Sequence, residues 1–160
     1  MPVITLETTI QAPVERCFDL SRSIELHLLS TEHTGEKAVA GKTKGLIGLG
    51  EQVTWRARHF GVWQQLTSKI TEYQYPVYFC DEMVRGAFKR FRHEHHFQAA
   101  GNFTVMRDVF DFQSPLGIAG RCANYLLLTA YMERLLTKRN QVIRRVAESD
   151  QWRELLTENP

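Results

Sequence analysis

The chain has 160 residues, 43% of them hydrophobic and 24% charged, which excludes a disordered or fibrous protein. This length is enough for one domain with its own core and short for two. Twenty basic and eighteen acidic residues leave a net charge of +2, which is too small to indicate nucleic acid or an anionic membrane as a partner. No apolar run is long enough to span a bilayer, so we expect no membrane insertion.

The cysteines and the first residues both favour a cytoplasmic protein. The cysteines Cys17, Cys80 and Cys122 are scattered and lack the spacing of metal ligands, so we expect them to be reduced. Residues 1–11 alternate in polarity, without the basic stretch and apolar block that make up a signal peptide.

The first part of the chain predicts one strand and two short helices. In residues 3–10, β-branched residues recur with a period of two, which predicts a strand. Pro13 suits the first turn of a helix that we expect to run to residue 20, and a second short helix follows over residues 24–29. The glycine-rich stretch 34–50 does not have the pattern of a phosphate-binding loop, so we expect a short strand and a loop there.

The middle of the chain predicts an antiparallel meander of five strands. Polarity alternates over residues 51–113, and turn-like sequences interrupt it only at 59–61, 75–76, 85–87 and 99–102. Residues 118–148 then carry apolar residues at helical spacing, which predicts one long amphipathic helix. At ~1.5 Å per residue, this helix would be on the order of 45 Å long and would cross the whole sheet.

The strand over residues 88–97 indicates which side chains face the interior. Its even-numbered positions after the first are charged or polar, whereas its odd-numbered positions are Phe91, His93, His95 and Phe97. Since successive side chains of a strand point to opposite faces, the odd-numbered set is expected to face inward. A tight turn centred between residues 100 and 101 would then place His93 opposite Asp108 and His95 opposite Met106.

An inward-facing polar group is therefore expected in an otherwise apolar interior, and it consists of Asp81, His93, His95 and Asp108. By the same alternation Asp81 lies diagonal to His93, while Cys80 points outward. Opposed residues have Cβ atoms about 5 Å apart, so His93 and Asp108 can touch. Because burial of unpaired polar groups is costly, we expect these groups to be hydrogen-bonded to one another or to water in a cavity.

The order of the elements and several segments resemble the START-like superfamily, also known as birch-pollen-allergen-like or SRPBCC. These segments are ITLETTIQAPVERCFDL, ELHLLSTEHTGEKAVAGKTKGLIGLGEQVTWRARHFG, YFCDEMVRGAFKRFRHEHHF and TVMRDVFDFQSPLG, together with the closing helix. More narrowly, the chain resembles the bacterial branch often labelled cell-division-inhibitor-like or polyketide-cyclase-like.

The resemblance implies an α+β helix-grip fold. In this fold a curved antiparallel sheet of six to seven strands wraps around a long C-terminal helix, and two short helices follow the first strand. Residues 1–150 would form a single START-like ligand-binding domain, and residues 151–160 a C-terminal tail. The resemblance also implies a deep cavity between the sheet and the long helix, usually for an apolar or aromatic small molecule such as a lipid or a polyketide.

Three functions remain open at this point. The first is binding of a hydrophobic or aromatic small molecule. We expect its site to comprise Trp55, Phe79, Asp81, Phe91, His93, His95, Met106, Asp108, Phe110, Tyr125, Leu128 and Met132. The second is an enzyme of the cyclase, dehydratase or isomerase type that uses His93 with Asp108 for acid–base catalysis. The third is a regulatory or structural partner domain with a filled core and no ligand.

Other partners are not expected. Two histidines two residues apart with a nearby carboxylate resemble a metal-ligand set, but histidine–carboxylate pairs without metal are the favoured interpretation, so we expect neither metal nor cofactor. The sheet arginines Arg56, Arg58, Arg90, Arg92 and Arg107 and the helix residues Arg134, Lys138, Arg139, Arg144 and Arg145 are expected to be solvated rather than to bind nucleic acid. The chain would be a monomer or a homodimer.

Overall fold

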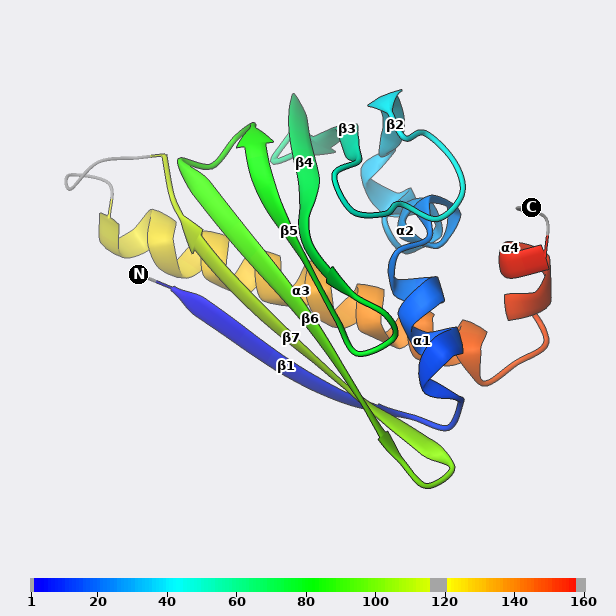
Figure 1. The fold of residues 1–160 in the computed structure, drawn as a ribbon. Helices are drawn as coiled ribbons and strands as arrows, with labels where there is room; N and C mark the ends of the chain where they lie inside the picture. The colour runs from blue at the N-terminus through cyan, green and yellow to red at the C-terminus, as the bar shows by residue number, and fades with distance from the viewer. Residues whose placement is uncertain (1, 116–120, 158–160) are drawn as a thin grey trace.

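A seven-stranded antiparallel sheet curves over one long helix in the computed structural model, which describes residues 2–115 and 121–157 (Figure 1). The strands are β1 (Val3–Ile10), β2 (Lys37–Gly41), β3 (Gln52–His59), β4 (Val62–Gln74), β5 (Tyr78–Arg85), β6 (Arg90–Ala100) and β7 (Phe103–Gln113). The helices are α1 (Val14–Ser21), α2 (Ile24–Ser30), the 3-10 turn η1 (Glu32–Thr34), α3 (Arg121–Ala147) and α4 (Trp152–Thr157). The predicted α+β helix-grip fold is thereby confirmed.

The strands follow the order β1-β7-β6-β5-β4-β3-β2 in the sheet. Strands that are adjacent in the sheet are therefore also consecutive in the chain, except for the pair β1 and β7. In this pair the first strand of the chain lies antiparallel to the last. The helix predicted over 118–148 is described from Arg121 onward and lies across the concave face of the sheet (Figure 1). In the described segments, no helix combines the length and the apolar composition needed to cross a membrane.

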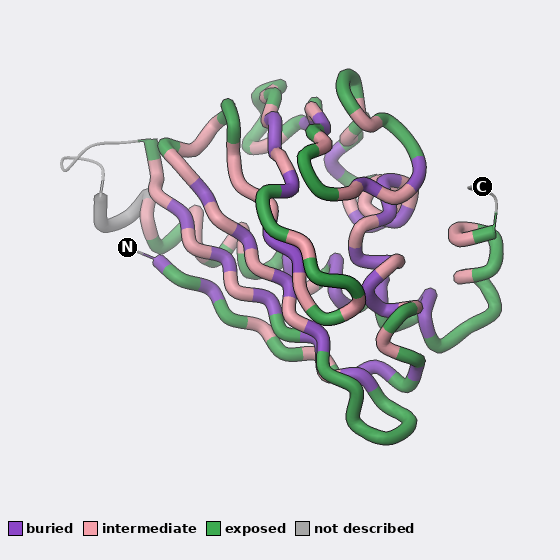
Figure 2. Tube along the Cα trace, in the orientation of Figure 1, coloured by how far each residue is buried: buried purple, intermediate pink, exposed green. Residues whose placement is uncertain are grey.

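The register of the β6–β7 hairpin differs from the predicted one by two residues. The strands run on to the pair Ala100–Phe103, so residues 101–102 alone form the turn, and Gly101 has the positive φ of 62° that such a tight turn requires. His95 therefore lies opposite Asp108, and His93 lies opposite Phe110. A shift of two residues leaves every side chain on its predicted face, as the alternating burial of β6 and β7 shows (Figure 2).

Asp81 is also placed differently from the prediction. It pairs directly with His93 across β5 and β6, rather than lying diagonal to it. Directly opposed residues have Cβ atoms about 5 Å apart, so the side chains of Asp81 and His93 lie close together.

Apolar packing holds α3 against the sheet in two clusters. The larger one surrounds the C-terminal half of the helix, where Ile143 and Val146 are fully buried together with Phe18 of α1. The smaller one joins Leu136 to a group of sheet residues that includes Phe110. Residues 125–135 of α3 pack less closely, since all of them are exposed or half-buried.

Three further expectations need correction or addition. Arg139, expected to be solvated, is only 7% exposed because its guanidinium lies against the buried carboxylate of Asp108. Cys80 lies on the outer face but is fully buried, since Arg92 bridges its two cross-strand neighbours by ion pairs. Within the expected tail 151–160, residues 152–157 form α4, whose Trp152 ring stacks under the guanidinium of Arg16.

The remaining surface expectations can be placed residue by residue. The solvated set, all of them exposed, consists of Arg56, Arg58, Arg107, Arg134, Lys138, Arg144 and Arg145. Arg90 and Arg92 are half-buried and form ion pairs on the outer face of the sheet. Cys17 is a free buried thiol, and the side chain of Cys122 lies outside the described residues.

Replacement of Ile143 by alanine tests the packing of α3. Because the side chain is completely buried, Ile143→Ala should lower the free energy of unfolding by roughly 2–5 kcal/mol, measured by urea denaturation. Leu126→Ala on the same helix is the control, since Leu126 is 68% exposed and its loss should change stability by less than about 0.5 kcal/mol. Equal losses in the two variants would contradict this packing.

Candidate functional site

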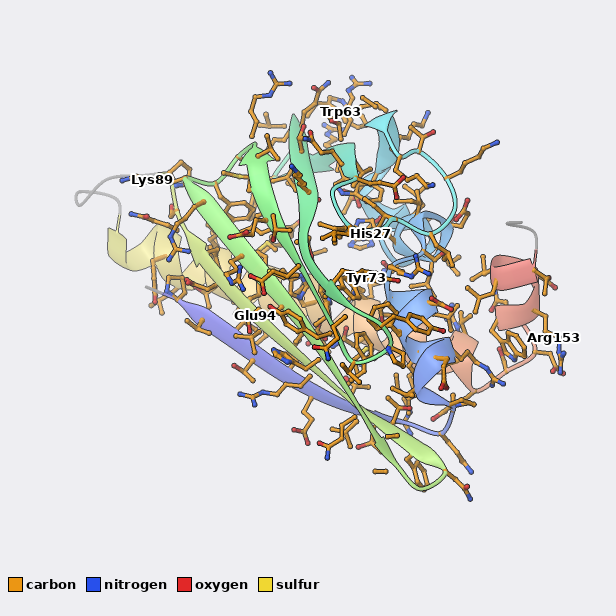
Figure 3. The ribbon with its side chains drawn as sticks, viewed as in Figure 1. His27, Trp63, Tyr73, Lys89, Glu94 and Arg153 are labelled. Carbon is orange, nitrogen blue, oxygen red and sulfur yellow. The ribbon has the colours of Figure 1, made fainter. Side chains whose placement is uncertain are left out.

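A cavity of about 990 Å³ lies between the sheet and α3. Nine of the expected ligand-binding residues line it: Trp55, Phe79, Asp81, Phe91, His93, His95, Phe110, Leu128 and Met132. His27 of α2 also lines the cavity (Figure 3). Its ring stacks on that of Trp55, with 4.0 Å between the ring centroids. The exposed wall surface is mainly apolar, and among its polar side chains are two groups whose members contact one another.

Three of the expected residues lie elsewhere. Met106 is fully buried in the core, where the Ser21 hydroxyl lies 3.5 Å from its Sδ. Asp108 lies behind His93 and His95 and is hidden from the cavity by them. Tyr125 is half-buried in the N-terminal half of α3 and is not among the wall residues of the described chain.

The buried carboxylate of Asp108 is the centre of the first polar group. Its Oδ1 lies 3.0 Å from His93 Nε2, 2.9 Å from His95 Nδ1 and 3.3 Å from a guanidinium nitrogen of Arg139. Its Oδ2 accepts a hydrogen bond of 2.7 Å from the side-chain amide of Asn140. Both carboxylate oxygens are therefore satisfied although the side chain is only 1% exposed.

These contacts determine the charge on Asp108. Burial alone would raise the pKa of Asp108, but hydrogen bonds from His93 and His95 and the charge of Arg139 outweigh it and hold that pKa well below its usual range. Burial, together with the neighbouring His95, lowers the pKa of His93 to about 4. At neutral pH the group thus contains an ionised Asp108 and a neutral His93 beside the guanidinium of Arg139.

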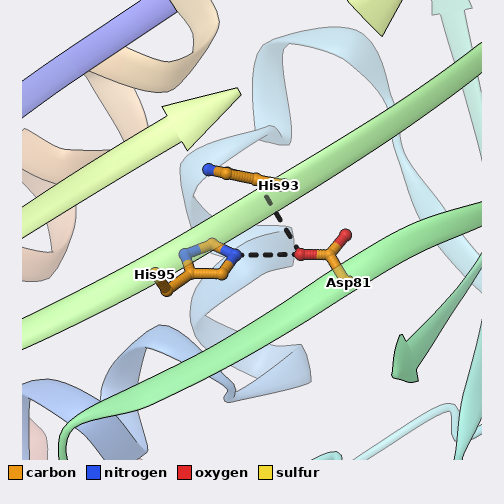
Figure 4. A group of neighbouring side chains, drawn as sticks. All are labelled: Asp81, His93 and His95. Atoms are coloured by element: carbon orange, nitrogen blue, oxygen red, sulfur yellow. Dashed lines mark hydrogen bonds and ion pairs between the residues drawn. The ribbon is translucent and has the colours of Figure 1, made fainter. Parts of the chain in front are cut away.

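Asp81 completes this group on the cavity side. Its Oδ1 lies 2.9 Å from His95 Nε2 and 3.9 Å from His93 Nδ1 (Figure 4). Burial alone would raise the pKa of Asp81. The hydrogen bond with His95 and the electrostatic interactions with the nearby histidines and Arg139 outweigh this effect and lower that pKa. Phe79 stacks on the His95 ring at 4.1 Å, and Phe110 meets the His93 ring edge to face at 5.2 Å, so both imidazoles are held in place.

The sequence interpretation missed Arg139 and Asn140. Both follow the apolar positions Met132 and Leu136 at helical spacing and precede Ile143, so the periodicity of α3 placed them on the buried face. Arg139 also donates to the backbone carbonyl of Ser21 at 3.1 Å. The signal was thus an arginine inside an apolar helical stripe, and its partner could be identified only from the folded chain.

A second polar group lines another part of the cavity and was also not predicted as a site. His27 Nε2 lies 2.9 Å from a carboxylate oxygen of Glu36, and His59 Nδ1 lies 2.6 Å from the Tyr131 hydroxyl. Burial lowers the pKa of His59, and burial would raise the pKa of Glu36 but is outweighed by His27, so that pKa is lowered. The His59–Tyr131 contact links β3 to α3 beside the cavity.

Comparisons with known proteins identify the class of fold. No protein-family model matches the sequence, and no curated protein sequence matches it either. Among solved structures, the chain is similar to the Zhui aromatase/cyclase from Streptomyces sp. R1128, with a TM-score of 0.73, 13% identity and 99% of both chains covered.

Two other solved structures resemble the chain to a similar degree. Major latex-like protein 151 from Panax ginseng has a TM-score of 0.67 and 15% identity, over 92% of this chain and 98% of that one. Protein TTHA0849 from Thermus thermophilus has a TM-score of 0.69 and 18% identity, over 89% of this chain and 97% of that one. The expected resemblance to START-like, SRPBCC proteins is confirmed at the level of the fold.

Replacement of Asp108 tests the buried polar group. Asp108→Asn leaves the Arg139 guanidinium buried without its counter-ion and should lower the free energy of unfolding by roughly 3–5 kcal/mol in chemical denaturation.

Asp111→Asn is the matched control, because Asp111 lies on the same strand but faces outward and pairs with Arg90 at 3.0 Å. Such a partly exposed pair contributes at most about 1 kcal/mol. If Asp108→Asn costs no more than the control, the buried charges do not constrain the fold as described.

Proposed function

We propose that the protein binds a hydrophobic or aromatic small molecule in the cavity between the sheet and α3. The observation that carries this proposal is a cavity of about 990 Å³ with aromatic and aliphatic walls and a polar group at Asp81, His93 and His95. Small-molecule sites are typically of this size and mostly apolar, with few polar groups that orient the ligand. A lipid or polyketide-like molecule with one hydrogen-bonding end fits this description.

The alternative of a ligand-free partner domain has less support. That alternative requires a core filled by side chains, since closely packed interiors contain few voids larger than a water molecule. A volume of about 990 Å³ is far larger than such a void. The ligand-binding proposal is therefore preferred.

A bulky residue in the wall of the cavity should weaken binding. Leu128 lines the cavity, whereas Leu126, two positions away on α3, is 68% exposed and is not a wall residue of the described chain. Leu128→Trp should weaken binding of the fluorescent probe 1-anilinonaphthalene-8-sulfonate by about tenfold or more, equivalent to roughly 1.4 kcal/mol, in a fluorescence titration.

Leu126→Trp carries the same change outside the cavity and should bind the probe like the parent protein. Competition by a panel of fatty acids and aromatic polyketides then identifies the ligand class. Equal affinity of both variants, or no saturable probe binding by the parent, would refute the proposal.

A second candidate, an enzyme of the cyclase, dehydratase or isomerase type, is favoured by one specific observation. His93 is neutral, lines the cavity and contacts the buried Asp108 through Nε2 at 3.0 Å. This leaves Nδ1 free of the Asp108 contact, and a carboxylate that orients an imidazole is a common device for proton transfer. One solved structure of similar fold is an aromatase/cyclase.

Replacement of His93 separates the enzyme from the binder. If the parent protein converts a poly-β-ketone or a related aromatic precursor, His93→Gln should lower kcat by about 10²–10⁴-fold with little change in KM. His96→Gln is the control, because His96 lies on the outer face of the same strand and pairs there with Glu94. Turnover that survives His93→Gln, or none in the parent across the panel, would eliminate this candidate.

A further inference from the structure

Three potential metal ligands converge on the polar side of the cavity. Asp81 of β5 and His93 and His95 of β6 each offer one donor atom, and these atoms lie within 4.8 Å of one another (Figure 4). The two histidines are on one face because they are two residues apart on a strand, and Asp81 is the direct cross-strand partner of His93. All three residues line the cavity, so an ion held by them would face its interior.

The opposite side of each imidazole is fixed by Asp108. His93 Nε2 and His95 Nδ1 lie 3.0 and 2.9 Å from the same oxygen, Asp108 Oδ1. The remaining nitrogens, His93 Nδ1 and His95 Nε2, are the ones that face Asp81 Oδ1. Metal-binding histidines in proteins almost always have their second nitrogen held by a carboxylate, carbonyl or water in this way, and the contact fixes the tautomer and the ring orientation.

The distribution of charge also favours a cation at this position. Asp108 is paired with Arg139, so the charges of those two groups compensate each other. Within the described residues, Asp81 forms no ion pair with a lysine or arginine, and only the two histidines lie at ion-pair distance from it. His93 contacts Asp108 through Nε2, so its Nδ1, which faces Asp81, is the nitrogen that can donate a lone pair to an ion.

We propose that Asp81, His93 and His95 bind a divalent transition-metal ion of the Zn²⁺ or Fe²⁺ type. Two imidazoles and one carboxylate are suited to these ions, and three protein ligands leave at least one coordination position for water or a polar atom of a cavity ligand. The ion takes the place of the hydrogen bond between His95 Nε2 and Asp81 Oδ1, and His95 keeps its ring proton on Nδ1, which lies 2.9 Å from Asp108 Oδ1. From the sequence alone, histidine–carboxylate pairs without metal were the favoured interpretation. The contacts of both histidines with Asp108, which hold the opposite nitrogens, now favour a metal site instead.

Titration of the metal-free protein with ZnCl₂ tests this site directly. The protein is prepared without a histidine tag, treated with a chelator and dialysed, and binding is measured by isothermal titration calorimetry. We expect one Zn²⁺ per chain and a raised Tm, because an ion that binds only the folded protein stabilises it. Zinc X-ray absorption of the wild-type complex should show two imidazole nitrogens and at least one oxygen, and this readout requires no variant.

Substitutions then locate the ion. Asp81→Asn keeps the shape of the side chain and should weaken Zn²⁺ binding by roughly 100-fold or more, as should His95→Gln. His96→Gln, which removes the adjacent outward-facing histidine, should leave the affinity unchanged. Probe binding in the cavity is measured on the same variants, so that failure of the metal site is distinguished from failure of the proposed ligand-binding function.

Three results would overturn the proposal. The first is the absence of Zn²⁺ and Fe²⁺ binding at stoichiometric concentration by the wild-type protein. The second is retention of the wild-type Zn²⁺ affinity in both Asp81→Asn and His95→Gln. The third is loss of binding in His96→Gln, which would place the ion on the outer face of the sheet.

Discussion

The ion pair between Asp108 of β7 and Arg139 of α3 couples the sheet to the helix that lies across it. Both side chains are buried, and a buried charge without a partner is strongly destabilising. The pair therefore fixes the rotation and the position of α3 over the sheet, and the bond from Arg139 to the carbonyl of Ser21 extends this constraint to α1. Apolar packing alone is non-directional and would specify this position less sharply.

The cavity follows from the way in which α3 is held. Ile143 and Val146 pack tightly around the C-terminal half of the helix, and Leu136 packs against the aromatic cluster of the sheet. Closer to the N-terminus of α3, Leu128 and Met132 line the cavity instead of filling it. The same Asp108 that anchors the helix also orients His93 and His95 toward this volume, so one buried carboxylate supports both the fold and the candidate site.

Much of the candidate site could be predicted because strand alternation is a local property. The inward positions of Asp81, His93 and His95 were predicted from polarity alone, and a register error of two residues left their faces unchanged. The predicted pairing was wrong because polarity does not determine the centre of the turn. The turn is centred between residues 101 and 102, one residue later than predicted, which moves every cross-strand partner by two. Arg139 was wrongly assigned to solvent although it lies in an apolar stripe of α3, and its partner Asp108, on a distant strand, could not be identified from its neighbours along the helix.

The sequence by itself determined the order of strands and helices, the face of each strand that turns inward and the presence of polar groups in an apolar interior. These properties depend on short-range periodicity, which is encoded within a few neighbouring residues. The tertiary structure alone decided that Arg139 and Asn140 meet Asp108, that Asp108 is shielded from the cavity and that about 990 Å³ is left unfilled. Such contacts join residues far apart in the chain, and their distances depend on how α3 packs across the sheet.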